Sequence, residues 1–226
     1  MRSYYEAYDE RYRTIHAMGE RWSGTAPTPI VLKTLRALEL PPEARVLELG
    51  CGEGRDALPV LAAGYELLAT DCSREAIAYC RRLAGARADR FQRLDFLRDS
   101  LPERFAAIYA VAVVHMLVED ADRRGFYRFV YEHLQPGGWA LVCSMGDGET
   151  SFRTDPREAF CLRERQHPGG PVQVAATSCR MVNFQSFERE LCESGLRVCE
   201  KGITPAMPDF DKLMFILARR PEEDRP

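Results

Sequence analysis

The chain has 226 residues, with 31 Lys and Arg against 34 Asp and Glu, and its formal net charge is -3. A chain so close to neutral lacks the positive field that draws proteins to nucleic-acid phosphates, so general nucleic-acid binding is disfavoured. Hydrophobic residues make up 46% and charged residues 29% of the sequence, which excludes a wholly disordered chain. At roughly 100 to 200 residues per domain, and without a Ser/Gly/Pro-rich linker, residues 1–226 are expected to form a single domain.

The apolar stretches and the cysteines bear on where the protein works. The most apolar uncharged stretch, residues 105–118, is shorter than the roughly 20 residues that span a bilayer. An acidic residue already stands at Glu6, which is not typical of a signal peptide. The eight cysteines form no C-x-x-C pair, and no carboxylate/His cluster has metal-ligand spacing, so free thiols and no metal are expected. These features predict a cytoplasmic protein with no membrane partner.

Helix-like and strand-like stretches alternate along the chain. Residues 1–40 are helical and aromatic, with Thr28 and Pro29 opening a second helix, and they are predicted to form a lid. The core is then predicted to hold strands at 45–49, 66–70, 90–96, 106–114 and 139–145 and helices at 55–63, 74–84 and 120–134. Residues 146–182 are predicted to be an insertion with one short helix that covers the substrate site. The chain ends with a predicted helix at 184–194 and strands at 196–202 and 212–219.

The predicted core strands are short and almost continuously apolar. Strands of this kind are buried on both faces of a parallel sheet. Alternating with helices, they predict an α/β fold with a doubly wound, Rossmann-like sheet and right-handed crossovers. Open sheets of this class bind their ligands at the carboxyl ends of the strands, so polar residues at those ends are the candidates for a site.

A glycine-rich loop follows the first core strand. Gly50, Gly52 and Gly54 lie between this strand and the next helix, where glycine allows unusual dihedrals and a close approach of a ligand to the backbone. The G-x-G-x-G spacing differs from the G-x-G-x-x-G of dinucleotide-binding proteins, and no G-K-[ST] of a P-loop follows. With Glu48 before it and Glu53 within it, the loop suits a ligand with a cationic amino acid end better than a triphosphate. The alternative is a purely structural turn.

Acidic residues stand at the ends of the next two strands. Asp71 ends the second strand, where a carboxylate can accept hydrogen bonds from both hydroxyls of a ribose; its alternative role is to cap the helix that follows. Asp95 could accept an adenine amino group while Phe96 packs on the ring, although Phe96 could equally be a core residue. Three such sites at three successive strand ends predict a nucleoside-type ligand more strongly than any one of them alone.

These motifs together resemble those of a known superfamily. The Glu-Leu-Gly-Cys-Gly-Glu-Gly run at 48–54, Asp71, the Leu-Asp-Phe run at 94–96 and the Leu-Gln-Pro-Gly-Gly turn at 134–138 resemble the class I S-adenosylmethionine-dependent methyltransferases. The aromatic N-terminal segment and the Gly-Glu-Gly-Arg-Asp run at 52–56 are similar to the tellurite- and thiopurine-type small-molecule branch. The resemblance covers residues 40–145 and implies a seven-stranded sheet whose last strand is antiparallel.

The resemblance also implies a cofactor, S-adenosyl-L-methionine, and a place for each of its parts. The three glycines would line the methionine part, Asp71 would hold the ribose, and Asp95 with Phe96 would hold the adenine. Cys51 and Cys72 border this site, although cysteine is also a common small hydrophobic residue. The complete set of residues predicted to bind the cofactor is Glu48, Gly50, Cys51, Gly52, Gly54, Asp71, Cys72, Asp95, Phe96 and Val111.

Methyl transfer from a sulfonium needs alignment of the nucleophile, and it needs a base only when the nucleophile must lose a proton. His115, just after the predicted strand at 106–114, is the candidate base, and a structural role for this histidine is an equal alternative. Trp22 is predicted to contact the substrate, or else to be the apolar side of a docked helix. Arg180 is predicted to bind an anionic acceptor, because arginine suits carboxylate recognition.

The segment after the strand at 106–114 has no Asn/Asp-Pro-Pro-Tyr/Phe run, the motif with which related enzymes hold a nucleobase amine. The sequence therefore favours transfer of a methyl group to the S, Se/Te, O or N atom of a small molecule. Two alternatives stay open. One is a non-catalytic module that binds S-adenosylmethionine, and the other is a protein or RNA methyltransferase.

Overall fold

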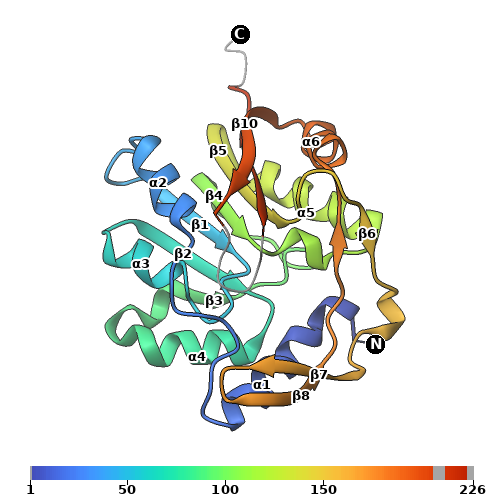
Figure 1. Ribbon diagram of the computed structural model, residues 1–226. Coiled ribbons are helices and arrows are strands. Elements are labelled where there is room, and N and C mark those ends of the chain that lie inside the picture. Colours follow the sequence, from blue (N-terminus) through green and yellow to red (C-terminus); the bar gives the residue numbers. More distant parts are fainter. Residues whose placement is uncertain (1, 206–211, 223–226) are drawn as a thin grey trace.

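The computed structural model describes residues 2–205 and 212–222. Its centre is a seven-stranded sheet with helices on both faces, and two small two-stranded sheets lie outside it (Figure 1). The strands of the large sheet are β1 (Arg45–Leu49), β2 (Glu66–Asp71), β3 (Phe91–Arg93), β4 (Phe105–Val111), β5 (Leu134–Met145), β10 (Arg197–Thr204) and β11 (Leu213–Arg219). The predicted α/β Rossmann-like class is confirmed.

The order of strands across the sheet is β10-β11-β5-β4-β1-β2-β3. The pairs from β5 to β3 are all parallel, whereas β11 runs antiparallel to both β5 and β10. The prediction of seven strands with an antiparallel last strand is therefore confirmed. Because β1 to β4 are parallel neighbours, their carboxyl ends lie together at one edge of the sheet, and this edge positions the site.

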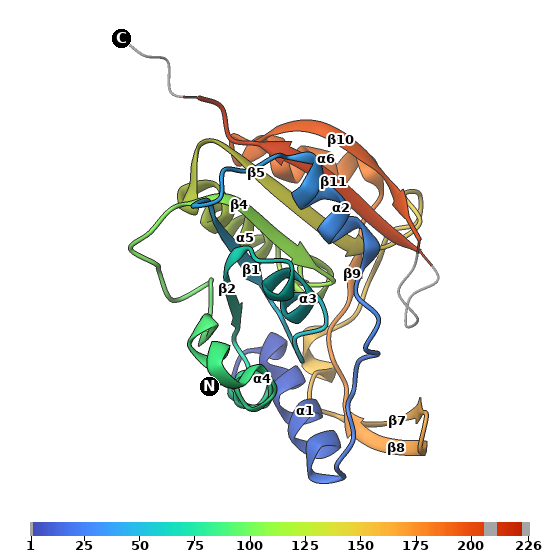
Figure 2. The ribbon, with the colours of Figure 1, turned by 90° about the vertical axis from the view of Figure 1, so that its left-hand side faces the viewer.

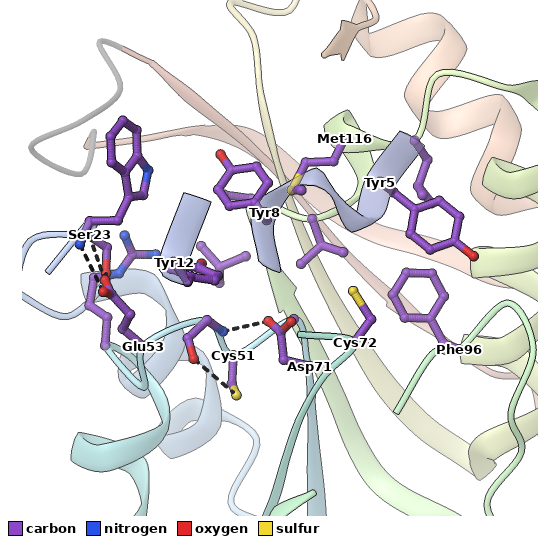
Figure 3. A pocket seen from close by; sticks show the side chains of 18 residues that line it. Tyr5, Tyr8, Tyr12, Ser23, Cys51, Glu53, Asp71, Cys72, Phe96 and Met116 are labelled. Carbon is purple, nitrogen blue, oxygen red and sulfur yellow. Dashed lines mark hydrogen bonds between the residues drawn. The ribbon is translucent and has the colours of Figure 1, made fainter. Parts of the chain in front are cut away.

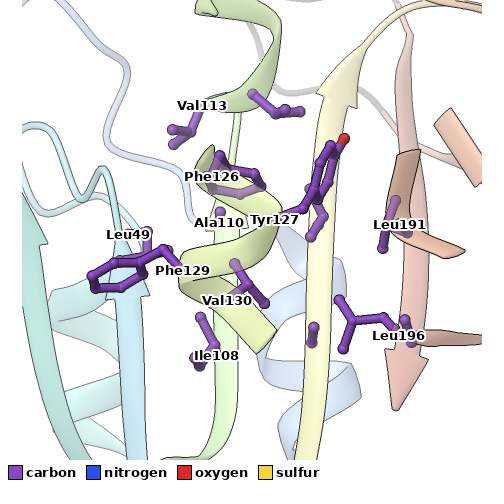
Figure 4. Packing of buried hydrophobic residues seen from close by; sticks show 14 of the residues in the cluster. Leu49, Ile108, Ala110, Val113, Phe126, Tyr127, Phe129, Val130, Leu191 and Leu196 are labelled. Atoms are coloured by element: carbon purple, nitrogen blue, oxygen red, sulfur yellow. The ribbon is translucent and has the colours of Figure 1, made fainter. Parts of the chain in front are cut away.

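The two faces of the sheet are covered by different helices (Figure 2). The helices are α1 (Ala7–Ala17), α2 (Pro29–Ala37), α3 (Ala57–Ala62), α4 (Arg74–Ala84), α5 (Asp120–His133) and α6 (Phe184–Glu193). Side chains of α2, α3 and α4 form one apolar core with the sheet, and those of α5 and α6 form the other. In β4, Ile108 and Ala110 face α5 (Figure 4). Tyr109 and Val111 face the opposite core, as strand alternation requires.

Strand β4 ends three residues earlier than the predicted strand at 106–114. Ala112 has φ +58°, in the left-handed region, and this turn ends the extended run. Residues Val114–Met116 then form a short 3-10 helix, η3. The apolar run thus contains a strand and a turn, which hydrophobicity alone does not separate. As a result His115 lies in η3.

Residues 146–182 are predicted to hold one short helix, but in the structure their regular elements are mainly short strands. Strands β7 (Leu162–His167) and β8 (Gly170–Ala175) form a hairpin, and β6 (Phe152–Arg153) pairs with β9 (Arg180–Met181). Besides these strands there is one 3-10 turn, η4 (Pro156–Glu158). The hairpin packs on α1, because Val172 and Val174 of β8 share a small apolar core with Ile15. The other short elements are the 3-10 turns η1 (Tyr4–Glu6) and η2 (Gly85–Arg90).

A buried ion pair holds α5, α6 and η3 together. Arg123 of α5 is 1% exposed, and its guanidinium donates to both carboxylate oxygens of Glu190 in α6, at 2.9 and 2.6 Å. Its remaining nitrogen donates to the carbonyl of Val114 at 2.7 Å, and Tyr127 donates to Glu190 at 3.0 Å. With these partners the buried charge is satisfied on every side.

We expect Glu190→Ala to lower the free energy of unfolding by about 3 kcal/mol, because it leaves the Arg123 charge buried without its partner. The matched control is Glu188→Ala on the same helix. Glu188 pairs with Lys201 at the surface, so its loss should cost about 0.5 kcal/mol. Chemical denaturation of both variants measures the difference, and equal losses would contradict the structural role given to Glu190.

Candidate functional site

A pocket lies at the carboxyl ends of the parallel strands, beneath the N-terminal segment (Figure 3). Its floor comes from the glycine loop and the ends of β2 and β4, and its roof comes from η1, α1 and the segment after α1. The lining residues are Tyr5, Tyr8, Tyr12, Trp22, Ser23, Gly50, Cys51, Gly52, Glu53, Arg55, Asp71, Cys72, Phe96, Val111, Ala112, Val113, Met116 and Leu117. The structure thus brings eight of the residues predicted to bind cofactor or substrate into one cavity: Trp22, Gly50, Cys51, Gly52, Asp71, Cys72, Phe96 and Val111.

Two glycines of the loop are required by both conformation and space. Gly50 has φ +72° and Gly52 has φ +51°, a region that side chains other than glycine rarely adopt. A Cβ at position 50 would lie 2.3 Å from Cγ2 of Val113, and one at position 52 would lie 2.8 Å from the hydroxyl oxygen of Tyr12. The backbone of the loop can therefore approach a ligand closely only because these positions lack side chains.

Asp71 connects the end of β2 to the glycine loop. Its Oδ2 accepts a hydrogen bond from the amide of Gly52 at 2.8 Å, and its Oδ1 accepts one from the amide of Ser73 at 2.8 Å. Burial raises the pKa of Asp71, while the two amide donors act in the opposite direction. Ser73 itself caps α4 by accepting from the amide of Ala76 at 3.0 Å. The alternative capping role considered for Asp71 is thus filled by Ser73.

Glu48 and Gly54 do not line the pocket. Glu48 is 2% exposed and accepts a hydrogen bond from the hydroxyl of Tyr109 at 2.9 Å, and burial raises its pKa well above the usual range. Gly54 lies against the side chains of Cys80 and Leu58. Both residues therefore shape the loop from behind, and neither is placed to contact a ligand directly.

The two residues after β3 have different positions. Phe96 lines the pocket, and its ring also packs edge-on against Phe126 at 5.3 Å between centroids. Asp95 is 2% exposed and lies outside the lining; it accepts hydrogen bonds from the hydroxyl of Tyr5 at 3.1 Å and from the amide of Leu97 at 3.1 Å. Of the two residues predicted to hold an adenine, only Phe96 therefore lines the pocket, and Asp95 binds the hydroxyl of Tyr5 instead.

Glu53 of the glycine loop anchors the roof. Its carboxylate is buried and accepts hydrogen bonds from the amide of Trp22 at 2.9 Å and from the amide and hydroxyl of Ser23 at 2.7 and 2.6 Å. His16 of α1 contacts the same carboxylate through Nε2 at 2.8 Å. Three residues further on, Asp56 accepts from the amide and hydroxyl of Thr28. The two acidic side chains of the loop therefore hold the segment that connects α1 to α2.

The other end of the roof is held as firmly. Asp9 of α1 accepts hydrogen bonds from the hydroxyl of Ser73 at 2.8 Å and from the amide of Glu75 at 3.2 Å. The hydroxyl of Tyr4 donates to Asp122 at 2.6 Å and accepts from the amide of Val118 at 3.2 Å. These bonds connect η1 and α1 to α4 and to the start of α5, on both sides of the pocket.

The sequence prediction missed most of the roof. Tyr5, Tyr8 and Tyr12 follow each other at spacings of three and four residues, so a helical segment places them on one face. That periodicity was the available signal for their common direction. Nothing in the local pattern indicated that Glu53, which is separated from Trp22 by 31 positions, would bind its backbone.

The position of His115 corrects its predicted role as a base. The side chain is 3% exposed and does not line the pocket, although its neighbours Met116 and Leu117 do. Burial, together with the charge of Arg123, lowers the pKa of His115 to about 4. His115 is therefore a neutral core residue at physiological pH, in agreement with the structural alternative.

Arg180 and Trp22, the two predicted substrate residues, differ in outcome. Arg180 does not line the pocket; it donates to the carbonyl of Val118 at 2.9 Å and to Asp120 at 2.6 Å, which joins β9 to the start of α5. Trp22 lines the pocket and also stacks with Arg11, whose guanidinium carbon lies 4.4 Å from the ring centroid. No residue of 146–182 is among the described residues that line the pocket. The β7–β8 hairpin of that segment packs on α1 instead.

Residues 2–205 and 212–222 contain no cluster of three or more His, Cys, Asp or Glu side chains suited to a metal ion. Nor does any helix in these ranges combine the length and the apolar character needed to cross a membrane.

The buried neutral state of His115 predicts a specific loss of stability in acid. Because its folded pKa of about 4 is below the ordinary 6.5, its contribution is fully present above pH 6.5 and is lost as the pH falls through 4. We expect the free energy of unfolding to fall by about 3 kcal/mol more in the natural chain than in His115→Gln between pH 7 and pH 4. Denaturation curves at several pH values test this, and parallel pH profiles would contradict it.

Comparison with protein families gives a match to the methyltransferase domain over residues 47–140. Among curated proteins, Hemagglutinin 1 of Eikenella corrodens is 32% identical over 108 residues, which are 46% of this chain and 35% of that protein. The chain thus spans about a third of the length of this curated relative.

Several solved structures share the fold. The CcbJ methyltransferase from Streptomyces caelestis has a TM-score of 0.68 at 18% identity, and the matched region covers 94% of this chain and 99% of the CcbJ chain. The glycopeptide N-methyltransferase MtfA, solved with S-adenosyl-L-methionine, has a TM-score of 0.63 at 24% identity, with 88% and 96% covered. An S-adenosylmethionine-dependent methyltransferase from Clostridium acetobutylicum has a TM-score of 0.62 at 15% identity, with 85% and 89% covered.

At these identities the likeness to solved structures is one of fold, while the family match concerns the sequence itself. The narrower link to the tellurite- and thiopurine-type branch stays a prediction. The matched methyltransferase domain at residues 47–140, the strand order and the glycine loop agree with one another, and together they are similar to those of the class I S-adenosylmethionine-dependent methyltransferases.

Proposed function

We propose that this chain is an enzyme that uses S-adenosyl-L-methionine to methylate a small molecule. The observation that carries the proposal is the pocket that the glycine loop, the end of β2 and helix α1 form at the carboxyl ends of the parallel strands. The match to the methyltransferase domain covers the loop and these strand ends, which supports the reading of the pocket as a cofactor site.

The residues present fit the cofactor. Gly50 and Gly52 leave the loop backbone open where a Cβ would collide with Val113 or Tyr12, and the half-buried carboxylate of Asp71 suits the hydroxyls of a ribose. Phe96 offers a ring face at the other end of the pocket for an adenine. We assign these residues, with Cys51, Cys72 and Val111 as apolar neighbours, to the binding of the adenosine part and the adjoining chain.

Arg55 supplies a feature that the sequence prediction did not use. It lines the pocket beside the glycine loop, its side chain is 12% exposed, and its buried Nε has no hydrogen-bond partner among the residues that the structure describes. Its single ion pair, from Nη2 to Asp56, is 3.3 Å long and is shared with the hydroxyl of Thr28. A guanidinium with an unused donor suits the carboxylate of the methionine part.

The roof favours a small acceptor over a macromolecule. Residues of η1 and α1 cover the pocket and are hydrogen-bonded to α4, to the start of α5 and to Glu53. A protein segment or a nucleic-acid strand would have to displace these contacts, whereas a small molecule fits beneath them. The net charge of -3 likewise gives no attraction to nucleic acid.

The catalytic contribution of the chain is positioning in a water-poor cavity. The cofactor, when bound, supplies an activated methyl group on a sulfonium. The cofactor would be held at its ends by Asp71, Arg55 and the backbone of the glycine loop. The space from which an acceptor can approach is limited by Tyr8, Trp22 and Met116. Alignment of this kind lowers the barrier of an in-line displacement without an acid or base.

The cofactor assignment predicts how two variants discriminate between ligands. S-adenosylhomocysteine carries the amino acid carboxylate, and 5′-methylthioadenosine lacks it. Arg55→Ala should weaken S-adenosylhomocysteine by about 10- to 100-fold, the scale of one charged hydrogen bond, and leave 5′-methylthioadenosine unchanged. Asp71→Asn should weaken both ligands to a similar extent, because both contain the ribose.

Isothermal titration calorimetry of the natural chain and both variants measures these affinities. Absence of S-adenosylhomocysteine binding below millimolar concentration would overturn the proposed function. Equal weakening of both ligands by Arg55→Ala would leave the site but remove Arg55 from its carboxylate end. Tight binding without methyl transfer to any acceptor would favour the non-catalytic module.

A further inference from the structure

The charged side chains of the pocket all lie on one side of it. Of the lining residues that the structure describes, only Glu53, Arg55 and Asp71 carry a formal charge, and they belong to the glycine loop and the end of β2. The segment from the end of β4 through η3 contributes only apolar residues: Val111, Ala112, Val113, Met116 and Leu117. The roof adds Tyr5, Tyr8, Tyr12, Trp22 and Ser23, none of which is charged.

Tyr8 and Met116 mark the uncharged side. In Figure 3 they lie together across the pocket from Cys51, Asp71 and Cys72. A ligand held by the glycine loop and Asp71 leaves this side for the second substrate. A phenol ring and a thioether are good partners for an apolar or aromatic surface, and neither neutralises an anion.

Three arginines of residues 146–182 that could have served an anionic acceptor pair with other residues. Arg180 is bound to Asp120 and a carbonyl, Arg157 pairs with Asp155, and Arg163 faces Glu158. None of these arginines lines the pocket. The anionic acceptor expected from the arginines of this segment therefore finds no cation on the acceptor side of the described cavity.

Among the lining residues of 2–205 and 212–222, the acidic and thiol groups are also poorly placed to take a proton from the acceptor. The carboxylates of Glu53 and Asp71 each receive hydrogen bonds on both oxygens. The hydroxyl of Tyr5 donates to Asp95, and burial raises its pKa to about 12. Burial also raises the pKa of the Cys72 thiol well above its usual range.

We propose that the acceptor is a small molecule with an apolar or aromatic body and no anionic substituent, that it binds between Tyr8 and Met116, and that its nucleophile reacts without a protein base. This inference rests on the proposed methyl transfer. It favours a thiol or an unprotonated amine over an alcohol, because an alcohol becomes a strong nucleophile only when a base removes its proton.

For a thiol, the balance of the reaction is as follows. The acceptor loses its proton to solvent, and the resulting thiolate, whose charge is balanced by the cationic sulfonium that it attacks and not by a protein cation, uses its electron pair to form the new bond to the methyl carbon. The bond from that carbon to the sulfonium sulfur breaks, and its electron pair stays on that sulfur. The products are a neutral thioether and S-adenosylhomocysteine.

A matched pair of thiols tests the charge preference. 4-Methylbenzenethiol and 4-mercaptobenzoate share the nucleophile and the ring and differ in one carboxylate. With the protein saturated by S-adenosylhomocysteine, we expect calorimetry to show at least tenfold tighter binding of 4-methylbenzenethiol, and kcat/KM with S-adenosylmethionine to follow the same order. The pH at which kcat/KM rises should follow the pKa of the thiol used.

Two variants of one position make the test specific to the acceptor side. Met116→Lys places a cation beside Tyr8 and should shift the binding ratio at least tenfold toward 4-mercaptobenzoate. Met116→Leu keeps the volume and the apolar character, so it should keep the preference of the natural chain. A Met116→Lys chain that fails to fold leaves the test with the natural chain and Met116→Leu.

The outcomes separate this inference from the proposed function. If S-adenosylhomocysteine binds but 4-mercaptobenzoate binds as well as the uncharged thiol, or neither thiol binds, the inference is overturned and the methyltransferase assignment stands. If the uncharged thiol is preferred while S-adenosylhomocysteine does not bind, the apolar acceptor side is supported and the proposed function fails. A pH profile that is identical for thiols of different pKa overturns the claim that no protein base takes part.

Discussion

The site depends on the hydrogen bonds that the buried carboxylate of Glu53 accepts. Glu53 belongs to the glycine loop, yet its hydrogen-bond partners lie in the N-terminal segment: the backbone of Trp22, the backbone and hydroxyl of Ser23, and the ring of His16. A carboxylate at this depth would be strongly unfavourable without such donors. The floor and the roof of the pocket are therefore ordered together, and neither has its observed form without the other.

Buried charge is used in the same way elsewhere in the fold. Asp56 holds Thr28 at the start of α2, Asp71 holds the amides of Gly52 and Ser73, and Arg123 holds Glu190. In each case the partners come from different elements, and removal of one partner would leave an uncompensated polar group. These contacts add little net stability over apolar packing, but they define which segments meet at the pocket.

The resulting pocket divides its chemistry between two sides. The glycine loop and β2 provide Glu53, Arg55 and Asp71, whereas the end of β4 and η3 provide only apolar side chains. The left-handed turn at Ala112 contributes to this division, because it ends β4 and directs Met116 and Leu117 into the lining while His115 is buried. A cavity with one polar and one apolar side suits a charged cofactor and an uncharged acceptor.

The sequence by itself determined the sheet class and the glycine loop with Asp71, because these depend on local periodicity and on glycine spacing. It did not distinguish which acidic residues face the cavity. Asp95 and Glu48 carry a carboxyl group as Asp71 does, but they accept hydrogen bonds from the hydroxyls of Tyr5 and Tyr109, respectively. Only the tertiary structure decided that His115 is buried, that Arg180 pairs with Asp120, and that Arg55 and Tyr8 line the pocket. The physical reason is that these outcomes depend on partners distant in sequence, whose burial and hydrogen bonds no local pattern encodes.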